Sequence, residues 1–141
     1  MQVGISHLVA SDLPLAEFLP QAAQAGYEVV EVCMRRQGDL TPQSQPEQLA
    51  QIVALAEANQ LKLVSMTHGH CTGNLLDAGE AQQTSIRETE TGLRAAAAMG
   101  IGCTLHALGV LRPDLYYDDA YRNGVHSLRR IPETAEKLKV T

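Results

Sequence analysis

Four of the five histidines in this sequence of 141 residues lie just after short apolar segments. These are His7, His68, His70 and His106, and only His126 falls within a segment of helical pattern. The apolar segments are typical of β-strands, and in parallel β/α folds the side chains that do chemistry gather at the carboxyl ends of the strands. Because neutral imidazole binds Zn, Mn, Co and Fe(II), this placement predicts a site that can hold a metal ion.

His68 and His106 are the main candidates for metal ligands. They end neighbouring predicted strands, so their side chains are expected to converge on one ion. His70 forms a His-X-His pair with His68 and is a further candidate, with His68 favoured of the two. The alternative is that these are loop histidines hydrogen-bonded to the backbone. The expected cofactor is a divalent metal, and Mn, Mg, Co and Zn all stay open.

Glu31 and His7 are assigned to substrate binding. Glu31 lies on the strand beside the one that ends at His68, where its carboxylate is expected to bind a substrate hydroxyl or to act as an oxygen ligand. His7 ends the first strand, at the same edge of the predicted sheet. Cys71 lies nearby, and for its thiol a buried or capping role is favoured over metal binding.

The sequence has no motif for nucleotide binding or for a serine nucleophile. No GxGxxG follows the first strand, and neither GxxxxGK[ST] nor GxSxG is present, so no phosphate-binding loop or nucleophile elbow is expected. The net charge of −5 gives no general attraction to nucleic acid or to anionic membranes. The arginines between residues 112 and 130 are interpreted as a solvated helix face.

The cysteines and the hydropathy indicate the compartment. Cys33, Cys71 and Cys103 cannot all pair within one chain, and they form no CxxC motif. Reduced thiols are typical of the cytosol. No apolar run approaches the roughly 18 residues that a membrane-spanning helix needs. We therefore expect a cytoplasmic protein with no membrane partner.

The elements that must position these groups are four strand–helix units. Their order and periodicity predict helices after each strand. The second and third helices are expected to begin at capping boxes, which start at Ser44 and Ser85, and the last helix is expected to be interrupted at Pro132. The predicted strands are residues 2–6, 27–33, 61–67 and 101–105.

Four consecutive units of this kind predict an α/β fold with parallel strands and right-handed crossovers. We expect the N-terminal half of an eight-stranded β/α barrel, because residues 139–141 resemble the opening of a fifth strand and a full barrel needs roughly 250 residues. Residues 1–141 then form a single incomplete barrel domain. Its open first and fourth strands are expected to drive self-association.

Three stretches of the sequence carry a resemblance to a known family. They are Gly-Tyr-Glu-Val-Val-Glu-Val at 26–32, Val-Ser-Met-Thr-His at 64–68 with Asn-Leu-Leu-Asp at 74–77, and residues 85–106. In order and spacing they are similar to the second strand, the third strand with its loop, and the third helix with the fourth strand of xylose isomerase-like TIM barrels. That superfamily includes sugar phosphate isomerases/epimerases and endonuclease IV, one of the AP endonuclease family 2 relatives. The resemblance covers only the N-terminal half of the family's fold.

The resemblance implies a metal-dependent sugar or sugar phosphate isomerase or epimerase. In that branch the metal polarises a ketose or aldose carbonyl and hydroxyl, and glutamates move a proton through an enediolate. His68 and His106 match the histidines that end strands three and four, and Glu31 matches the glutamate at the end of strand two. The family's main metal carboxylates and catalytic glutamates lie on strands five to eight. This chain alone is therefore expected to be catalytically incomplete.

Two other functions are compatible with the same scaffold. One is a metal-dependent phosphodiester hydrolase similar to endonuclease IV, which the acidic balance of the chain disfavours because phosphate contacts need Lys and Arg. The other is a non-catalytic, truncated half-barrel whose exposed final strand recruits a partner. The favoured partner is a small-molecule sugar or sugar phosphate, and nucleic acid is not favoured.

Overall fold

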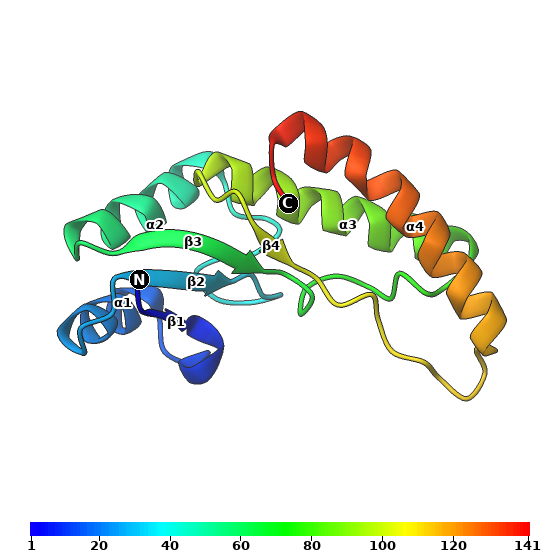
Figure 1. Cartoon of the computed structure of the whole chain (residues 1–141), viewed down its shortest axis with the longest axis horizontal. Helices are drawn as coiled ribbons and strands as arrows, with labels where there is room; N and C mark the ends of the chain where they lie inside the picture. Colours follow the sequence, from blue (N-terminus) through cyan, green and yellow to red (C-terminus); the bar gives the residue numbers. More distant parts are fainter.

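The sheet is parallel and has four strands in sequence order. The computed structural model describes residues 1–141 and places β1 (Gly4–Ser6), β2 (Val29–Cys33), β3 (Lys62–Thr67) and β4 (Thr104–Leu105) side by side (Figure 1). Every neighbouring pair is parallel, as β/α units require. The predicted α/β fold of four parallel units is confirmed.

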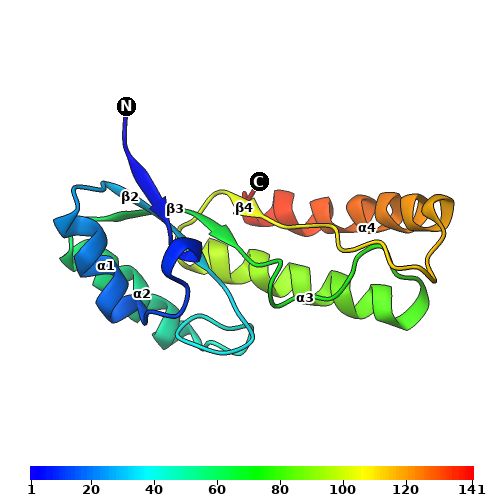
Figure 2. The same cartoon turned by 90° about the horizontal axis from the view of Figure 1, so that it is seen from below.

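Helices cover one side of this sheet. They are α1 (Leu15–Gln24), α2 (Pro46–Ala58), α3 (Gly79–Ala98) and α4 (Tyr117–Leu138), and a short 3₁₀ helix (His7–Ala10) follows β1. Figure 2 shows α1, α2 and α3 on the same side of the strands, with α4 running beside α3 and extending past the end of β4. No helix of the chain is both long and apolar enough to cross a bilayer.

The side-chain alternation of β2 separates the core from the open face of the sheet. Val30 and Val32 have no exposed surface and pack in the hydrophobic core with Leu19 and Met66. Because successive side chains of a strand point to opposite faces, Glu31 between the two valines lies on the face that α1, α2 and α3 leave uncovered. The fold therefore presents a carboxylate on the open side of the sheet.

The start of α3 differs from the prediction. The helix already begins at Gly79, whereas the capping box predicted a start at Ser85. Inside the helix the Ser85 hydroxyl donates to the Ala81 carbonyl at 2.9 Å. The preceding turn is held by α4, because the buried Gln82 amide donates to the Ser127 hydroxyl at 3.0 Å. A tertiary contact, which local sequence does not show, extends the helix. The capping box of α2 is displaced by one residue, because Gln45 and Gln48 form it, whereas the sequence predicted a box that starts at Ser44.

The end of the chain pairs with the outer edge of β4. The backbone N–H of Thr141 donates to the Gly102 carbonyl at 2.9 Å, and the N–H of Thr104 donates to the Thr141 carbonyl at 2.6 Å. Of the residues expected to open a fifth strand, 139–141, only Thr141 makes such bonds: Lys139 is the left-handed cap of α4, and the N–H of Val140 donates to the Ala135 carbonyl of that helix. The regular part of β4 is shorter than predicted, since only Thr104–Leu105 form it. The predicted interruption of the last helix at Pro132 is wrong, because α4 runs through this proline from Tyr117 to Leu138.

Candidate functional site

Glu31 is held between two serines on the open face of the sheet. The Ser6 hydroxyl on β1 donates to Oε1 of Glu31 at 2.7 Å, and the Ser65 hydroxyl on β3 donates to Oε2 at 3.0 Å. The strand register places the three residues in one row. No lysine, arginine or histidine pairs with this carboxylate. Because each carboxylate oxygen accepts more than one hydrogen bond, Glu31 can still accept donors from a ligand.

A break in the register puts Ser65 opposite Glu31. Val30 pairs with Leu63, but Glu31 pairs with Ser65, so Val64 is an extra residue on β3 at this point. Bulges of this kind re-aim side chains near functional sites. Regular pairing would have placed Val64 beside Glu31, which is why sequence reasoning did not find Ser65. The signal that could have found Ser6 was its position on the strand beside β2.

His7 lies at the end of β1, as predicted, and is only 5% exposed. Its Nε2 lies 2.9 Å from the Leu13 carbonyl oxygen. A carbonyl can only accept, so Nε2 carries the proton and Nδ1 of the neutral ring is an acceptor. That buried Nδ1 has no hydrogen-bond partner in the protein. The imidazole packs against Phe18, with 4.7 Å between ring centroids.

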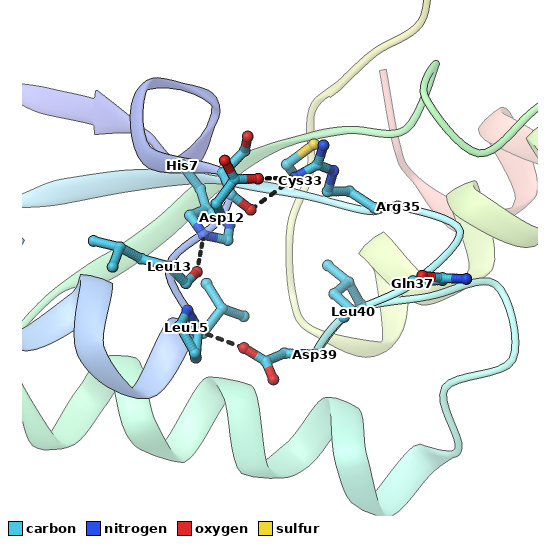
Figure 3. Close-up of a pocket in the computed structure, with 12 residues that line it drawn as sticks. His7, Asp12, Leu13, Leu15, Cys33, Arg35, Gln37, Asp39 and Leu40 are labelled. Atoms are coloured by element: carbon cyan, nitrogen blue, oxygen red, sulfur yellow. Dashed lines mark hydrogen bonds and ion pairs between the residues drawn. The ribbon is translucent and has the colours of Figure 1, made fainter.

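The His7 ring lines a small cavity between the loops that follow β1 and β2. The cavity has a volume of about 130 Å³, and Cys33, Arg35 and Asp39 contribute to its wall (Figure 3). Two hydrogen bonds tie the loops together. Asp39 Oδ2 accepts from the N–H of Leu15 at 2.6 Å, and Arg35 Nη1 donates to the Ser11 carbonyl at 2.7 Å. Asp39 thereby provides an acceptor for one of the free backbone N–H groups in the first turn of α1.

His68 and His106 are brought together, as their predicted positions required. Their ring centroids lie 4.9 Å apart in an edge-on arrangement. His68 has no exposed surface and neither of its ring nitrogens has a partner. Burial, helped by the neighbouring His106, lowers the pKa of His68 to about 4. Burial also lowers the pKa of His106, whose Nε2 lies 2.6 Å from Thr72 Oγ1 and 3.2 Å from Thr89 Oγ1.

The two histidines do not by themselves make a metal centre. No group of three or more His, Cys, Asp or Glu side chains in the chain is arranged to hold an ion, whereas a catalytic site usually takes three protein ligands. His70 is exposed and lines a different, polar hollow with Arg35 and Arg36. His68 packs against Gly92 of α3. The metal-ligand roles of the three histidines stay predictions.

Cys71 has the buried role that its sequence context favoured. Its Sγ donates to the His68 carbonyl at 3.1 Å. Burial raises the pKa of the Cys71 thiol to about 11, so the sulfur is a protonated thiol at neutral pH. All three cysteines are free.

The fold and the polar residues along its strands define a class of protein: an open half of a parallel β/α barrel with polar side chains on its open face and at the carboxyl ends of the strands. The family model described as the xylose isomerase-like TIM barrel matches residues 19–141, and the chain belongs to this family. No curated protein sequence matches the chain significantly.

Solved structures similar to this chain include sugar epimerases. A crystal structure of D-psicose 3-epimerase in the presence of D-fructose superposes with a TM-score of 0.81 at 20% identity, over 100% of this chain and 50% of that one. D-Psicose 3-epimerase from Clostridium cellulolyticum H10 with D-tagatose gives 0.80 at 17% identity, over 99% and 50%. The 3-keto-D-glucoside 4-epimerase from E. coli gives 0.75 at 16% identity, over 100% and 54%. The chain thus spans about half the length of these structures, and the likeness establishes a shared half-barrel fold.

Proposed function

We propose that this chain forms part of a sugar isomerase or epimerase that moves a proton on a ketose or aldose. The observation that carries the proposal is the Glu31 carboxylate, held by Ser6 and Ser65 on the open face of the sheet. Membership of the xylose isomerase-like family supports it, as does the likeness to epimerases whose structures contain D-fructose or D-tagatose.

The proposed role of these residues is to bind sugar hydroxyls. A sugar presents many O–H donors, and this site offers acceptors in the free lone pairs of the Glu31 carboxylate. Hydrogen bonds to a charged group contribute about 1.5–3 kcal/mol, more than neutral pairs do. Glu31 is therefore the anchor of the proposed site, and the substrate-binding role of His7 stays a prediction.

A divalent metal, one of Mn, Mg, Co or Zn, belongs to the chemistry that the family resemblance implies. Such an ion would polarise a sugar carbonyl. The donor set of these 141 residues does not complete a site for it, since no three suitable side chains converge. We therefore assign hydroxyl binding to this chain and infer that turnover requires catalytic groups beyond those it contains.

Calorimetric titration of the chain with D-fructose and D-tagatose tests the proposal. Glu31→Gln replaces an acceptor oxygen with an amide that donates, so the variant should bind the preferred sugar at least roughly tenfold more weakly, a loss of about 1.4 kcal/mol. Glu28→Gln is the matched control, because Glu28 precedes the same strand and its side chain is exposed. Circular dichroism would verify that both variants fold. Unchanged affinity in Glu31→Gln, or no sugar binding by the parent chain, would contradict the proposal.

A further inference from the structure

An apolar groove lies between α4 and the chain that leads into it, away from the residues of the proposed sugar site. It has a volume of about 200 Å³, and eight of the nine residues that line it are hydrophobic. Leu76, Leu108 and Leu111 line it from the loops after β3 and β4, and α4 forms the other wall. Figure 1 shows the chain after β4 running out to the far end of α4, where the helix begins and returns beside α3. Contiguous apolar surface of this kind is typical of a contact site.

Hydrogen bonds hold both walls of the groove in place. On the loop side, the N–H of Leu75 donates to the Leu108 carbonyl at 2.9 Å. On the helix side, Asn123 Nδ2 donates to the Leu76 carbonyl at 2.9 Å, and the Ser127 hydroxyl donates to the Leu75 carbonyl at 2.8 Å. Both walls are thus fastened to residues 75–76. A partner therefore meets a preformed groove and does not have to order it, which lowers the cost of binding.

The helix side of the groove is an exposed apolar stripe along α4. Its members follow one another at spacings of four, four and three residues, and they are Tyr117, Tyr121, Val125 and Leu128. Tyr117 is 69% exposed, Tyr121 63% and Leu128 49%, and the two tyrosine rings stack with their centroids 6.4 Å apart. Spacings of three and four residues are those by which one helix packs along another. The stripe therefore predicts a helical partner.

Two unpaired charges flank the stripe. Asp118 and Arg129 are exposed and form no ion pair, although Arg122 and Glu133 lie four residues after them on α4. Arg122 pairs with Asp119 instead. Asp118 and Arg129 lie three helical turns apart, so both are on the same side of the helix, about 16 Å from each other along its axis. The stripe thus has a free negative charge near its start and a free positive charge near its end.

We propose that this face of α4 binds a second copy of the chain, with the two α4 helices antiparallel. A two-fold contact joins identical patches, so such a patch must be complementary to itself. In the antiparallel arrangement Asp118 lies opposite the partner's Arg129, and Tyr121 packs between the partner's Val125 and the partner's Leu128. The opposite charges at the two ends favour a second copy over an unrelated apolar helix. This contact is separate from strand pairing at the edges of the sheet.

Sedimentation velocity of the Leu105→Lys variant tests the contact apart from pairing at the β4 edge. Leu105 is 59% exposed at that edge, and a lysine there opposes strand pairing. In a series up to several hundred micromolar, this variant should still reach a dimer. Adding Tyr121→Glu should weaken that dimer at least roughly tenfold, because it removes an aromatic anchor from the centre of the contact. Adding Val9→Glu is the control, since Val9 is comparably exposed on the 3₁₀ helix.

Exchanging the two flanking charges tests the antiparallel register. In the same background, Asp118→Arg and Arg129→Asp each place like charges opposite one another and should weaken the dimer. The variant with both changes restores the opposite charges and should dimerise as the Leu105→Lys chain does. Circular dichroism would verify that every variant folds. A monomer throughout the series, equal dimers with Tyr121→Glu and Val9→Glu, or a double variant no stronger than the single ones would overturn the proposal.

Discussion

At the scale of single residues, His68 is a polar group enclosed in the protein interior. It has no exposed surface and neither ring nitrogen has a partner. Adding a positive charge to a ring that water cannot reach is costly, so the pKa falls to about 4, first through burial and second through His106. The imidazole is therefore neutral in the folded protein at any pH near neutrality.

Because His68 is buried in its neutral form, the free energy of unfolding should depend on pH. The folded-state pKa of His68 lies below the ordinary value of 6.5, so the unfolded chain binds the proton more readily in the interval from about pH 6.5 down to about pH 4. Stability should fall as the pH falls through that interval, by roughly 3 kcal/mol from His68 alone. Urea unfolding at pH 7 and at pH 4 measures the loss.

His68→Leu keeps the volume and removes the titrating group, so its free energy of unfolding should depend less steeply on pH than that of the parent chain. His126→Leu is the control, since His126 is exposed on α4. An identical pH dependence in His68→Leu and the parent chain would contradict the assignment of this effect to His68.

At the scale of elements, α3 approaches the loop after β3 so closely that one helix position must be glycine. A Cβ at Gly92 would lie 2.5 Å from Nδ1 and 2.8 Å from Cγ of His68. Glycine in a helix interior costs roughly 1 kcal/mol relative to alanine. The close packing of the His68 ring on α3 outweighs that cost.

Gly92→Ala should therefore destabilise the chain by about 1–3 kcal/mol, because the ring is fully buried and cannot yield without moving its neighbours. Gly124→Ala in α4 is the matched control: its Cβ would meet only the flexible tip of Leu76, at 3.1 Å. That variant should be neutral or stabilising. In a His68→Ala background, Gly92→Ala should cost much less. Equal effects at positions 92 and 124 in thermal unfolding would contradict this packing argument.

The elements also show which parts of the site were predictable. Strand patterning located Glu31, His7 and the His68–His106 pair, because alternation and strand order decide which residues share an edge. It did not locate Ser65, because the extra residue Val64 shifts the register by one. The early start of α3 was missed for a related reason: contacts with α4 stabilise its first turn. Strand pairing and helix packing both join residues far apart in the sequence, so local patterns do not reveal them.

At the scale of the whole molecule, the sheet has two edges and an open face. β1 and β4 are the outer strands, and Thr141 covers only part of the β4 edge. Apolar residues lie exposed at both edges: Val3 is 50% exposed and Leu105 is 59% exposed. Such edges are templates for pairing with another chain, so we expect the chain to self-associate.

Native mass spectrometry should show a dimer or larger species for the parent chain at micromolar concentration. Leu105→Lys places a charge on the β4 edge and should shift the population toward monomer. Val9→Lys is the control for the β4 edge, because Val9 is exposed on the 3₁₀ helix that follows β1, at the other end of the strand order from β4. A monomeric parent chain that unfolds cooperatively would contradict this expectation.

The most direct test of the central claim, that the open face of this half-barrel binds a sugar, is an NMR titration of the ¹⁵N-labelled chain with D-fructose and D-tagatose. The account predicts saturable shifts of the backbone amides of Ser6, Glu31 and Ser65, which form the proposed site. The exposed faces of α1 and α2 should be unaffected. Absence of shifts, or shifts confined to the helices, would contradict it.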